Sequence, residues 1–455
     1  MLFIINYTKL CLWSSIYYFY RYDTIFDIIL KNINDCGCIA IKFTQWILPK
    51  LEMVHNLDPK KDKWFSKLEQ FYEYNEIHNT EYTKKIYYND FNHNFDDDYI
   101  FDSIIGSGSI GQVYKITNKH TRKNYALKVI HPNIEYQIIF IKYLILFIQY
   151  IPFINNYLKY YIPIDIYQFI IDFKNQTNMI KESNNCLQFY ENYKHNQFIV
   201  IPKIHKVSNN IIIMSYENGT RFDNLQCNDY MKFKCIQLLQ IFLKNNQIIT
   251  NFNHGDIHKG NWKIKIHENN PYLIIYDYGF CWEIPYQDKY MLDLIEDTFM
   301  KLDNNNHQNY REELIRICNF ILNKKCSHKI INDELNKYQL ITDPLILLKI
   351  IINIAKNEKI ILDSILLQIL IYMNQFIKYL EDYGLIRNED NIKDGFITYE
   401  YYRKRLVDIY CLCKTHHIFI KYQKFIETKI NSIEINDPFE TIDLEYDFEN
   451  IKKFL

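Results

Sequence analysis

"HGDIHKGNW", residues 254–262, gathers two histidines, an aspartate, two glycines and an asparagine in a chain otherwise rich in apolar and aromatic residues. Short polar clusters of this kind are typical of loops. Asp256 and Asn261 have the spacing of a phosphotransfer loop, in which the aspartate orients or deprotonates the acceptor and the asparagine binds Mg²⁺. His254 is expected to support this loop rather than to transfer protons. A satisfied polar turn is the alternative for this stretch taken alone.

A second carboxylate follows at the end of an expected strand. The β-rich run "YLIIYDYG", residues 272–279, ends in Asp277, Tyr278 and Gly279. An aspartate just past a strand and next to a glycine can bridge Mg²⁺ to phosphates, although a plain hairpin also fits these three residues. We therefore predict Asn261 and Asp277 as magnesium ligands and Asp256 as a catalytic residue.

Glycines with the spacing G-x-G-x-x-G occur in "IIGSGSIGQVYKI", residues 104–116. Alone this pattern is weak, and a plain glycine-rich turn remains an alternative. A dinucleotide-binding fingerprint requires a helix after the glycines, whereas the residues that follow here have strand character. A strand, a glycine loop and a second strand form the nucleotide flap of a kinase-type lobe. The residues expected to bind the nucleotide here are Gly106, Ser107, Gly108, Ser109, Gly111 and Val113.

A lysine inside an apolar strand completes the pattern. Lys128 lies in "ALKVI", and a buried ammonium group is costly unless it is paired or touches an anion. A kinase-type strand lysine contacts the α- and β-phosphates and pairs with a glutamate on a helix, which Glu182 can supply. A solvated lysine on an edge strand is the alternative. The adenine edge is expected near Met214 to Glu217, and the ordered set of motifs favours kinase-type binding of ATP and Mg²⁺.

The chain has 455 residues and a formal charge of −1, which gives no general attraction to nucleic acid. The order of helical and β-rich runs predicts an α+β, two-lobed protein-kinase-like fold. Its expected parts are an N-terminal helical extension (1–95), an N-lobe with a helical insert (96–219) and a helical C-lobe (220–455).

Two apolar stretches and the cysteines need separate treatment. The first twenty residues are too interrupted for a span and predict an amphipathic, membrane-touching helix. Residues 138–154 carry Lys142 and Pro152 and predict a buried helical insert. The 11 cysteines are scattered, which is typical of reduced thiols. "CLCKTHH", residues 411–417, could bind a metal, but two core thiols on a helix are the favoured interpretation.

Four stretches resemble the ADCK/UbiB family of atypical kinases, which is tied to coenzyme Q biology. "SIGQVYKI" resembles the family's S-I-x-Q-V loop and "KESNNCLQF" its E-x-x-N helix, with Glu182 and Asn185. "HGDIHKGN" resembles H-x-D-x-H-x-G-N, and "IKFTQW" resembles K-x-G-Q, with Lys42 and Gln45 as regulatory residues. The resemblance runs from about residue 38 to at least 300. It implies a helical insert between Lys128 and Glu182, and a membrane span there would separate two groups that must touch.

Three departures from the family pattern concern regulation. The alanine-rich loop is replaced by Gly106-Ser107-Gly108, and the glycine of K-x-G-Q by Thr44. The family's E-x-D pair falls on Gln176-Thr177-Asn178, so we expect Lys42 to be held weakly.

The resemblance implies an ATP- and Mg²⁺-dependent atypical kinase or ATPase that transfers or hydrolyses the γ-phosphate. The alternatives are a nucleotide-binding pseudokinase scaffold, or a kinase acting on protein or on a small lipid-like molecule. The implied partners are ATP and a membrane surface or a lipid- or quinone-like ligand, with no nucleic acid. An intracellular protein is expected, with a membrane-associated or a mitochondrial location as open alternatives. The sequence does not specify the acceptor or the oligomeric state.

Overall fold

The computed structural model describes residues 2–55, 67–68, 77–152, 163–283 and 310–362, apart from scattered positions that lie mostly between 229 and 249. The chain divides into two compact units. The first comprises Met1–Leu187, Pro202–Glu217 and Tyr278–Phe280, and the second comprises Gln188–Ile201, Asn218–Asp277 and Cys281–Leu455. The "CLCKTHH" stretch, for which a metal site was the less favoured interpretation, lies outside the described residues.

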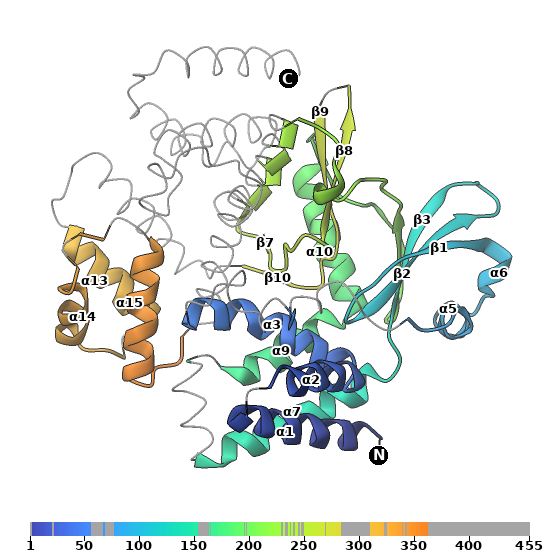
Figure 1. The fold of residues 1–455 in the computed structure, drawn as a ribbon. Helices are drawn as coiled ribbons and strands as arrows, with labels where there is room; N and C mark the ends of the chain where they lie inside the picture. Colours follow the sequence, from blue (N-terminus) through green and yellow to red (C-terminus); the bar gives the residue numbers. More distant parts are fainter. Residues whose placement is uncertain are drawn as a thin grey trace, which may run out of the picture. The chain divides into compact units, whose positions relative to one another are not determined.

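The first unit contains a five-stranded antiparallel sheet in the order β1-β2-β3-β6-β5 (Figure 1). Its strands are β1 (Tyr99–Ser107), β2 (Gly111–Asn118), β3 (Asn124–Ile130), β5 (Ile204–Val207) and β6 (Ile211–Ser215). The three strands expected around the glycine loop are therefore extended by two later strands. Alternate residues face a core shared with α5 (Thr80–Phe91) and α6 (Phe95–Asp98), including Ile116, Leu127, Val129, Ile211 and Ile213.

Only one glycine of the G-x-G-x-x-G pattern is required by packing. A Cβ atom on Gly111 would lie 2.6 Å from the Val129 carbonyl oxygen, because β2 and β3 approach closely there. A Cβ atom on Gly106 would meet no atom within 4 Å. The space beside Gly106 is thus open, as a loop that receives a ligand requires.

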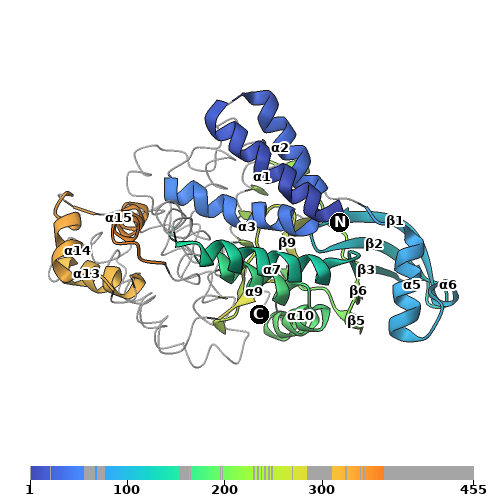
Figure 2. The ribbon, with the colours of Figure 1, turned by 90° about the horizontal axis from the view of Figure 1, so that it is seen from below.

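Helices form the rest of the first unit (Figure 2): α1 (Leu2–Tyr20), α2 (Asp23–Asp35), α3 (Cys38–His55), α7 (Ile134–Tyr150), α9 (Ile166–Gln176) and the first part of α10 (Met179–Tyr193). Apolar residues of α2 and the start of α3 form a second core, which Tyr7, Leu10, Trp13 and Tyr17 of α1 join. Among the described residues, no helix combines the length and apolar character needed to cross a bilayer.

Two predictions for the helices need correction. The insert helix α7 is buried on one face only, at Ile138, Ile141 and Ile145, a spacing of one helical face. Its other face exposes large apolar residues: Tyr136, Ile139, Tyr143, Leu146, Phe147 and Tyr150. The reason is that α7 packs on α3 and α9 from one side. Helix α1 is not amphipathic, since it packs partly buried apolar residues against the second core and also exposes Ile4, Leu12 and Phe19.

The described part of the second unit contains two small sheets. In one, β4 (Ile199–Val200) pairs in parallel with β9 (Asn270–Ile275), which pairs with β8 (Trp262–His267) in a hairpin. In the other, β7 (Asn253–His254) pairs with β10 (Cys281–Trp282). Strand β8 was not predicted, because its lysines and histidine hide the alternation that buries Trp262 and Ile264. The remaining elements are the 3₁₀ turn η2 (Phe222–Asn224), α13 (Tyr310–Ile321), α14 (His328–Leu335) and α15 (Pro344–Asn357).

Candidate functional site

Lys128 and Glu182 form a buried ion pair in the first unit. The Lys128 ammonium group donates to both carboxylate oxygens of Glu182, at 2.7 and 2.9 Å. The two side chains are only 7% and 1% exposed. Lys128 lies in β3 between two core residues and therefore points to the opposite face of the sheet. Glu182 lies in the first turn of α10, where the helix dipole favours a negative charge.

One departure from the family pattern serves the same helix. The Asn178 side-chain oxygen accepts a hydrogen bond from the Lys181 amide at 3.0 Å, which caps the start of α10 one turn ahead of Glu182. Gln176, the other substituted position, is buried at 4% exposure. Of the two neutral residues, Asn178 thus stabilises the start of the helix that carries the glutamate.

Helix α10 also fixes the segment that follows Asp277. The Asn185 side-chain amide donates to the Tyr278 carbonyl oxygen at 2.8 Å, and Asn185 is 9% exposed. Tyr278 itself is almost completely buried. Asn185, one turn after Glu182, therefore anchors the Asp-Tyr-Gly segment to the helix that carries the glutamate.

The other predicted nucleotide residues of the first unit surround the same strands. The glycine loop closes with a hydrogen bond from the Gly108 amide to the Gly111 carbonyl oxygen at 3.0 Å. Val113 is the cross-strand partner of Lys128, and Met214 is the partner of Ala126, two residues earlier in β3. Glu217 follows β6 and accepts a hydrogen bond from the Ser215 hydroxyl at 2.6 Å.

Helix α3 reaches the glycine loop through the predicted regulatory motif. The Ser109 hydroxyl donates to the Gln45 side-chain oxygen at 3.3 Å. Lys42 is 9% exposed, and its being held weakly stays a prediction.

The sequence reasoning missed a polar contact between α3 and α9. Lys50 is 3% exposed, with its ammonium group 3.0 Å from the Trp46 carbonyl oxygen and 4.0 Å from the centre of the Trp46 ring. Asp172 of α9 interacts with both residues, and burial raises the pKa of its carboxyl group. The i, i+4 spacing of Trp46 and Lys50 puts them on one helix face, but no sequence signal links them to Asp172.

In the second unit, His254 organises the loop that carries Asp256. His254 is fully buried, and its Nε2 donates to the Tyr276 carbonyl oxygen at 3.0 Å. Its Nδ1 therefore accepts, and the Asp256 amide donates to it at 3.2 Å. Burial lowers the pKa of this imidazole. A neutral ring bonded on both sides has a supporting role, because neither nitrogen is available to transfer a proton.

The candidate metal ligands are Asn261, at the end of the Asp256 loop, and Asp277, which follows β9. The Asn261 side-chain amide donates to the Asp256 carbonyl oxygen at 2.7 Å, which closes the loop. The Tyr276 amide donates to the Asn261 carbonyl oxygen at 2.8 Å, so Asn261 lies beside the end of β9. Asp277 follows at once with a positive φ of 57°, a strained conformation for a residue other than glycine. Asp256 and Asp277 both act electrostatically on His254.

These oxygen donors suit a hard divalent cation such as Mg²⁺. The Asn261 amide uses its NH₂ group within the loop, which leaves its oxygen as the ligand atom, and Asp277 adds a carboxylate. Mg²⁺ is commonly held by one or two such groups together with water and phosphate oxygens. Within the described residues no group of three or more His, Cys, Asp or Glu side chains could hold a metal alone.

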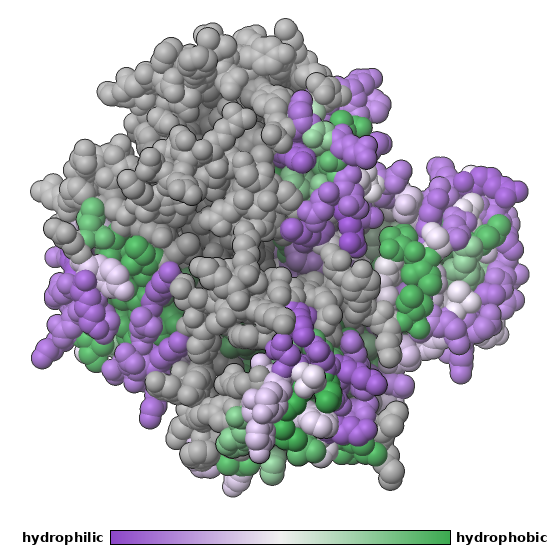
Figure 3. Space-filling view, viewed as in Figure 1, coloured by the Kyte–Doolittle hydropathy of each residue, from purple (hydrophilic) through white to green (hydrophobic). Residues whose placement is uncertain are grey.

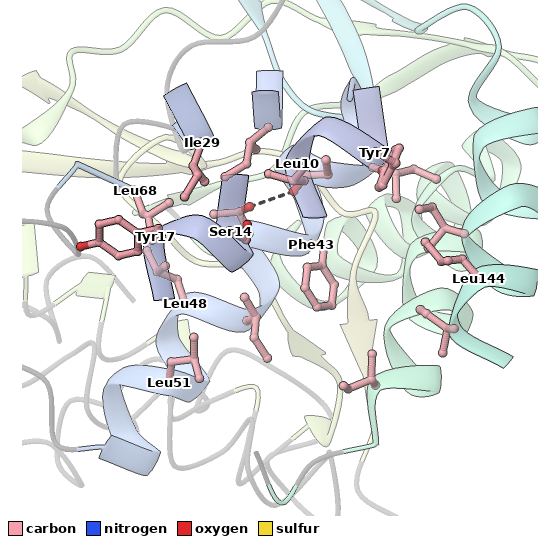
Figure 4. Close-up of a pocket in the computed structure, with 18 of the residues that line it drawn as sticks. Tyr7, Leu10, Ser14, Tyr17, Ile29, Phe43, Leu48, Leu51, Leu68 and Leu144 are labelled. Atoms are coloured by element: carbon pink, nitrogen blue, oxygen red, sulfur yellow. Dashed lines mark hydrogen bonds between the residues drawn. The ribbon is translucent and has the colours of Figure 1, made fainter. Parts of the chain in front are cut away.

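A cavity of about 590 Å³ lies among the N-terminal helices of the first unit (Figure 4). Its walls come from α1, α2, α3 and α7, and Tyr7, Leu10, Phe43, Leu48 and Leu144 point into it. Most of the lining is apolar, with Ser14, Thr44 and Gln149 as the polar exceptions. Figure 3 shows hydrophobic patches between hydrophilic residues over these helices, at the bottom of the view. The cavity suits an apolar small molecule or an alkyl chain.

Comparison with known proteins gives the following similarities. A 27% identical relative from Blochmanniella pennsylvanica, described as a probable protein kinase UbiB, matches over 198 residues, or 41% of this chain. The match spans 36% of that relative's length. A solved structure of a Rv3197–erythromycin complex from Mycobacterium tuberculosis aligns with 58% of this chain and 66% of its own, with a TM-score of 0.41 and 14% identity.

The model of the ABC1 atypical kinase-like domain matches residues 75–312, which is more than half of the chain. The match covers the glycine loop, the Lys128–Glu182 pair and the loop of Asp256 and Asn261. It confirms the predicted kinase-like α+β fold and the predicted family. This chain is a member of the ABC1 family of atypical kinase-like proteins, to which UbiB belongs.

Proposed function

We propose that this chain binds ATP with Mg²⁺ and transfers or hydrolyses the γ-phosphate. The observation that carries the proposal is the buried contact of Lys128 with Glu182 beside an open glycine loop. A lysine held in one position by a carboxylate is the group that grips the α- and β-phosphates in kinases.

The residues proposed for these roles belong to both units. In the first unit, the backbone of residues 106–111 covers the phosphates, Val113 and Met214 offer apolar contacts for adenine, and Glu217 lies at the strand end where its polar edge is expected. In the second unit, Asn261 and Asp277 would hold Mg²⁺, whose charge would offset that of the phosphates. Asp256 positions the acceptor hydroxyl or water and accepts its proton.

A nucleotide-binding pseudokinase is the competing class, and the Asp256 carboxylate distinguishes it from an enzyme. Exchanging Asp256 for Asn keeps the backbone contacts of the loop but removes the base. We expect Asp256→Asn to lower ATP turnover by about 100-fold or more while MgATP still binds. Phosphate release by the purified full chain measures this, with the exposed Asp333→Asn variant as the matched control. Unchanged turnover in Asp256→Asn would exclude Asp256 as the base, and no turnover in the wild type would favour the scaffold.

We further propose that an anionic membrane surface or a lipid- or quinone-like ligand acts on the first unit. The apolar cavity and the exposed aromatic residues of α7 support this. The same turnover assay, with anionic vesicles, quinone-bearing vesicles or neutral vesicles as the control, tests it. Stimulation by one of the first two and not by neutral vesicles is the expected result, whereas equal rates in all three would contradict the proposal.

A further inference from the structure

Two neighbouring histidines, His78 and His131, lie next to the glycine loop, and His131 contacts it. His131 follows β3 directly and is 6% exposed, and His78 precedes α5. Their Nδ1 atoms are 3.0 Å apart. His131 Nε2 lies 2.9 Å from the Gly108 carbonyl oxygen, and 3.4 Å from the Ser107 hydroxyl. The two contacts of His131 Nε2 end at the glycine loop of the site described above, to which neither histidine was assigned.

If both imidazole rings are neutral, their hydrogen-bond partners allow only one placement of the ring protons. The Gly108 carbonyl oxygen can only accept, so His131 Nε2 carries a proton and its Nδ1 accepts. His78 Nδ1 must then donate to His131, and His78 Nε2 lies 3.1 Å from the Thr83 hydroxyl, which in turn donates to the Tyr114 hydroxyl at 3.0 Å. Burial lowers the pKa of His78 to about 4 and also lowers that of His131, which agrees with neutral rings.

The backbone of His78 is fixed as well. Its amide donates to the Gln112 side-chain oxygen at 2.8 Å, and the Gln112 side-chain amide donates to the His78 carbonyl oxygen at 3.2 Å. Gln112 and Thr83 are both completely buried. His78 is thereby bound to β2, immediately after the glycine loop, and it fixes the ring orientation of His131.

The hydrogen bond from His131 decides which way one peptide group of the loop points. In a planar trans peptide the carbonyl group and the following N–H point in opposite directions. Because the Gly108 carbonyl is turned toward His131, the Ser109 N–H is turned away from it. Glycine lets the backbone rotate easily at residue 108, so without this bond the peptide could reverse.

We propose that His131, oriented by His78, is a positioning residue that holds the Ser109 N–H toward the nucleotide phosphates. The proposal rests on the proposed nucleotide binding for its ligand. It adds a specific role for two histidines outside the glycine pattern. The loop sequence alone would leave the peptide between Gly108 and Ser109 free to take either orientation.

Two substitutions of His131 separate this role from packing. His131→Phe keeps the ring and removes both nitrogens, whereas His131→Gln keeps an N–H near the position of Nε2. His120→Phe, at a histidine whose side chain is 72% exposed, is the matched control. Affinities for MgADP and for adenosine are measured by calorimetry on the full chain, and melting temperatures report folding. Hydrogen exchange of residues 106–111 without nucleotide reports the loop itself.

We expect His131→Phe to weaken MgADP binding by about three- to tenfold, the effect of one hydrogen bond, with adenosine affinity unchanged. Exchange in the loop should become faster in the same variant. His131→Gln should retain most of the MgADP affinity, and His120→Phe all of it. If His131→Phe does not fold, His131→Asn takes its place, since its amide is too short to reach Gly108.

Three results would overturn the proposal. The first is wild-type MgADP affinity in a folded His131→Phe protein, and the second is an equal loss for adenosine, which would indicate a packing role. The third is unchanged exchange of the loop in that variant. A wild-type chain that binds neither MgADP nor MgATP would instead contradict the proposed function, and the exchange measurement would then decide the loop's dependence on His131 alone.

Discussion

The Lys128 ammonium group and the Glu182 carboxylate are both nearly removed from water, which is costly for each group separately. Their two short hydrogen bonds offset that cost only while both partners are present. A buried pair of this kind is weak evidence for stability, because well-packed apolar residues often replace it without loss. The presence of the Lys128–Glu182 pair is therefore better explained by a function that needs a charged group at a fixed position than by a contribution to stability.

Substitution of either partner alone should therefore destabilise the protein more than substitution of both. Lys128→Met leaves the Glu182 carboxylate buried without its cation and should lower the free energy of unfolding by about 3–5 kcal/mol. In Lys128→Met/Glu182→Gln both charges are absent, and most of that loss should be recovered. Urea unfolding of the four proteins in the double-mutant cycle measures the effect. A single variant as stable as the wild type would mean that the pair is more hydrated than its burial indicates.

At the scale of elements, the hairpin of β2 and β3 depends on Gly111. A Cβ atom there would meet the backbone of Val129, which cannot move without breaking the pairing of the two strands. Gly111→Ala should lower stability by about 1–3 kcal/mol, as overpacking of a well-ordered site does. Gly106→Ala is the matched control and should leave the melting temperature unchanged, because its Cβ atom enters open space. Equal effects of the two substitutions would show that the close approach of β2 and β3 relaxes easily.

Elements with a strong local pattern could be predicted from the sequence, and those defined by partners could not. The β-rich runs of β2 and β3 were predicted as strands, and the role of the glycine loop and of Lys128 followed from their positions on these strands. The role of Glu182 followed from its position on a helical pattern. Strand β8 was missed because its lysines hide its β pattern. Only β9, the other strand of the hairpin, showed β character in the sequence. The one-sided burial of α7 depends on α3 and α9, which are distant in sequence.

The candidate site likewise contains residues that the sequence could predict and residues that it could not. Asp256 and Asn261 lie five residues apart, so their spacing carried information, and Asn261 does close the loop on Asp256. His78 and His131 are separated by 53 residues, and Asp172 is far from Lys50 in sequence. A single chain gives no signal for such pairs, because the contact exists only after the strands and helices have packed.

At the scale of the whole molecule, histidines of both units link stability to pH. Burial lowers the pKa values of His78 and His131 in the first unit and of His254 in the second. In the unfolded chain these imidazoles take up protons near pH 6.5, whereas the folded protein keeps them neutral to lower pH. The unfolded state therefore binds more protons, and stability must fall as the pH drops from about 6.5 toward 4. Asp172, whose pKa is raised, opposes this trend at the acidic end.

Between pH 7 and pH 5 we expect the free energy of unfolding to decrease, with His78 contributing about 1 kcal/mol after allowance for its partial exposure to solvent. His78→Gln removes the titrating group and should reduce the slope of stability against pH. His120→Gln, at a histidine whose side chain is 72% exposed, is the matched control. Urea unfolding at several pH values compares the three proteins. A slope as steep in His78→Gln as in the wild type would mean that His78 takes up its proton in the folded protein as readily as in the unfolded chain, and the assignment of a neutral His78 ring would then be wrong.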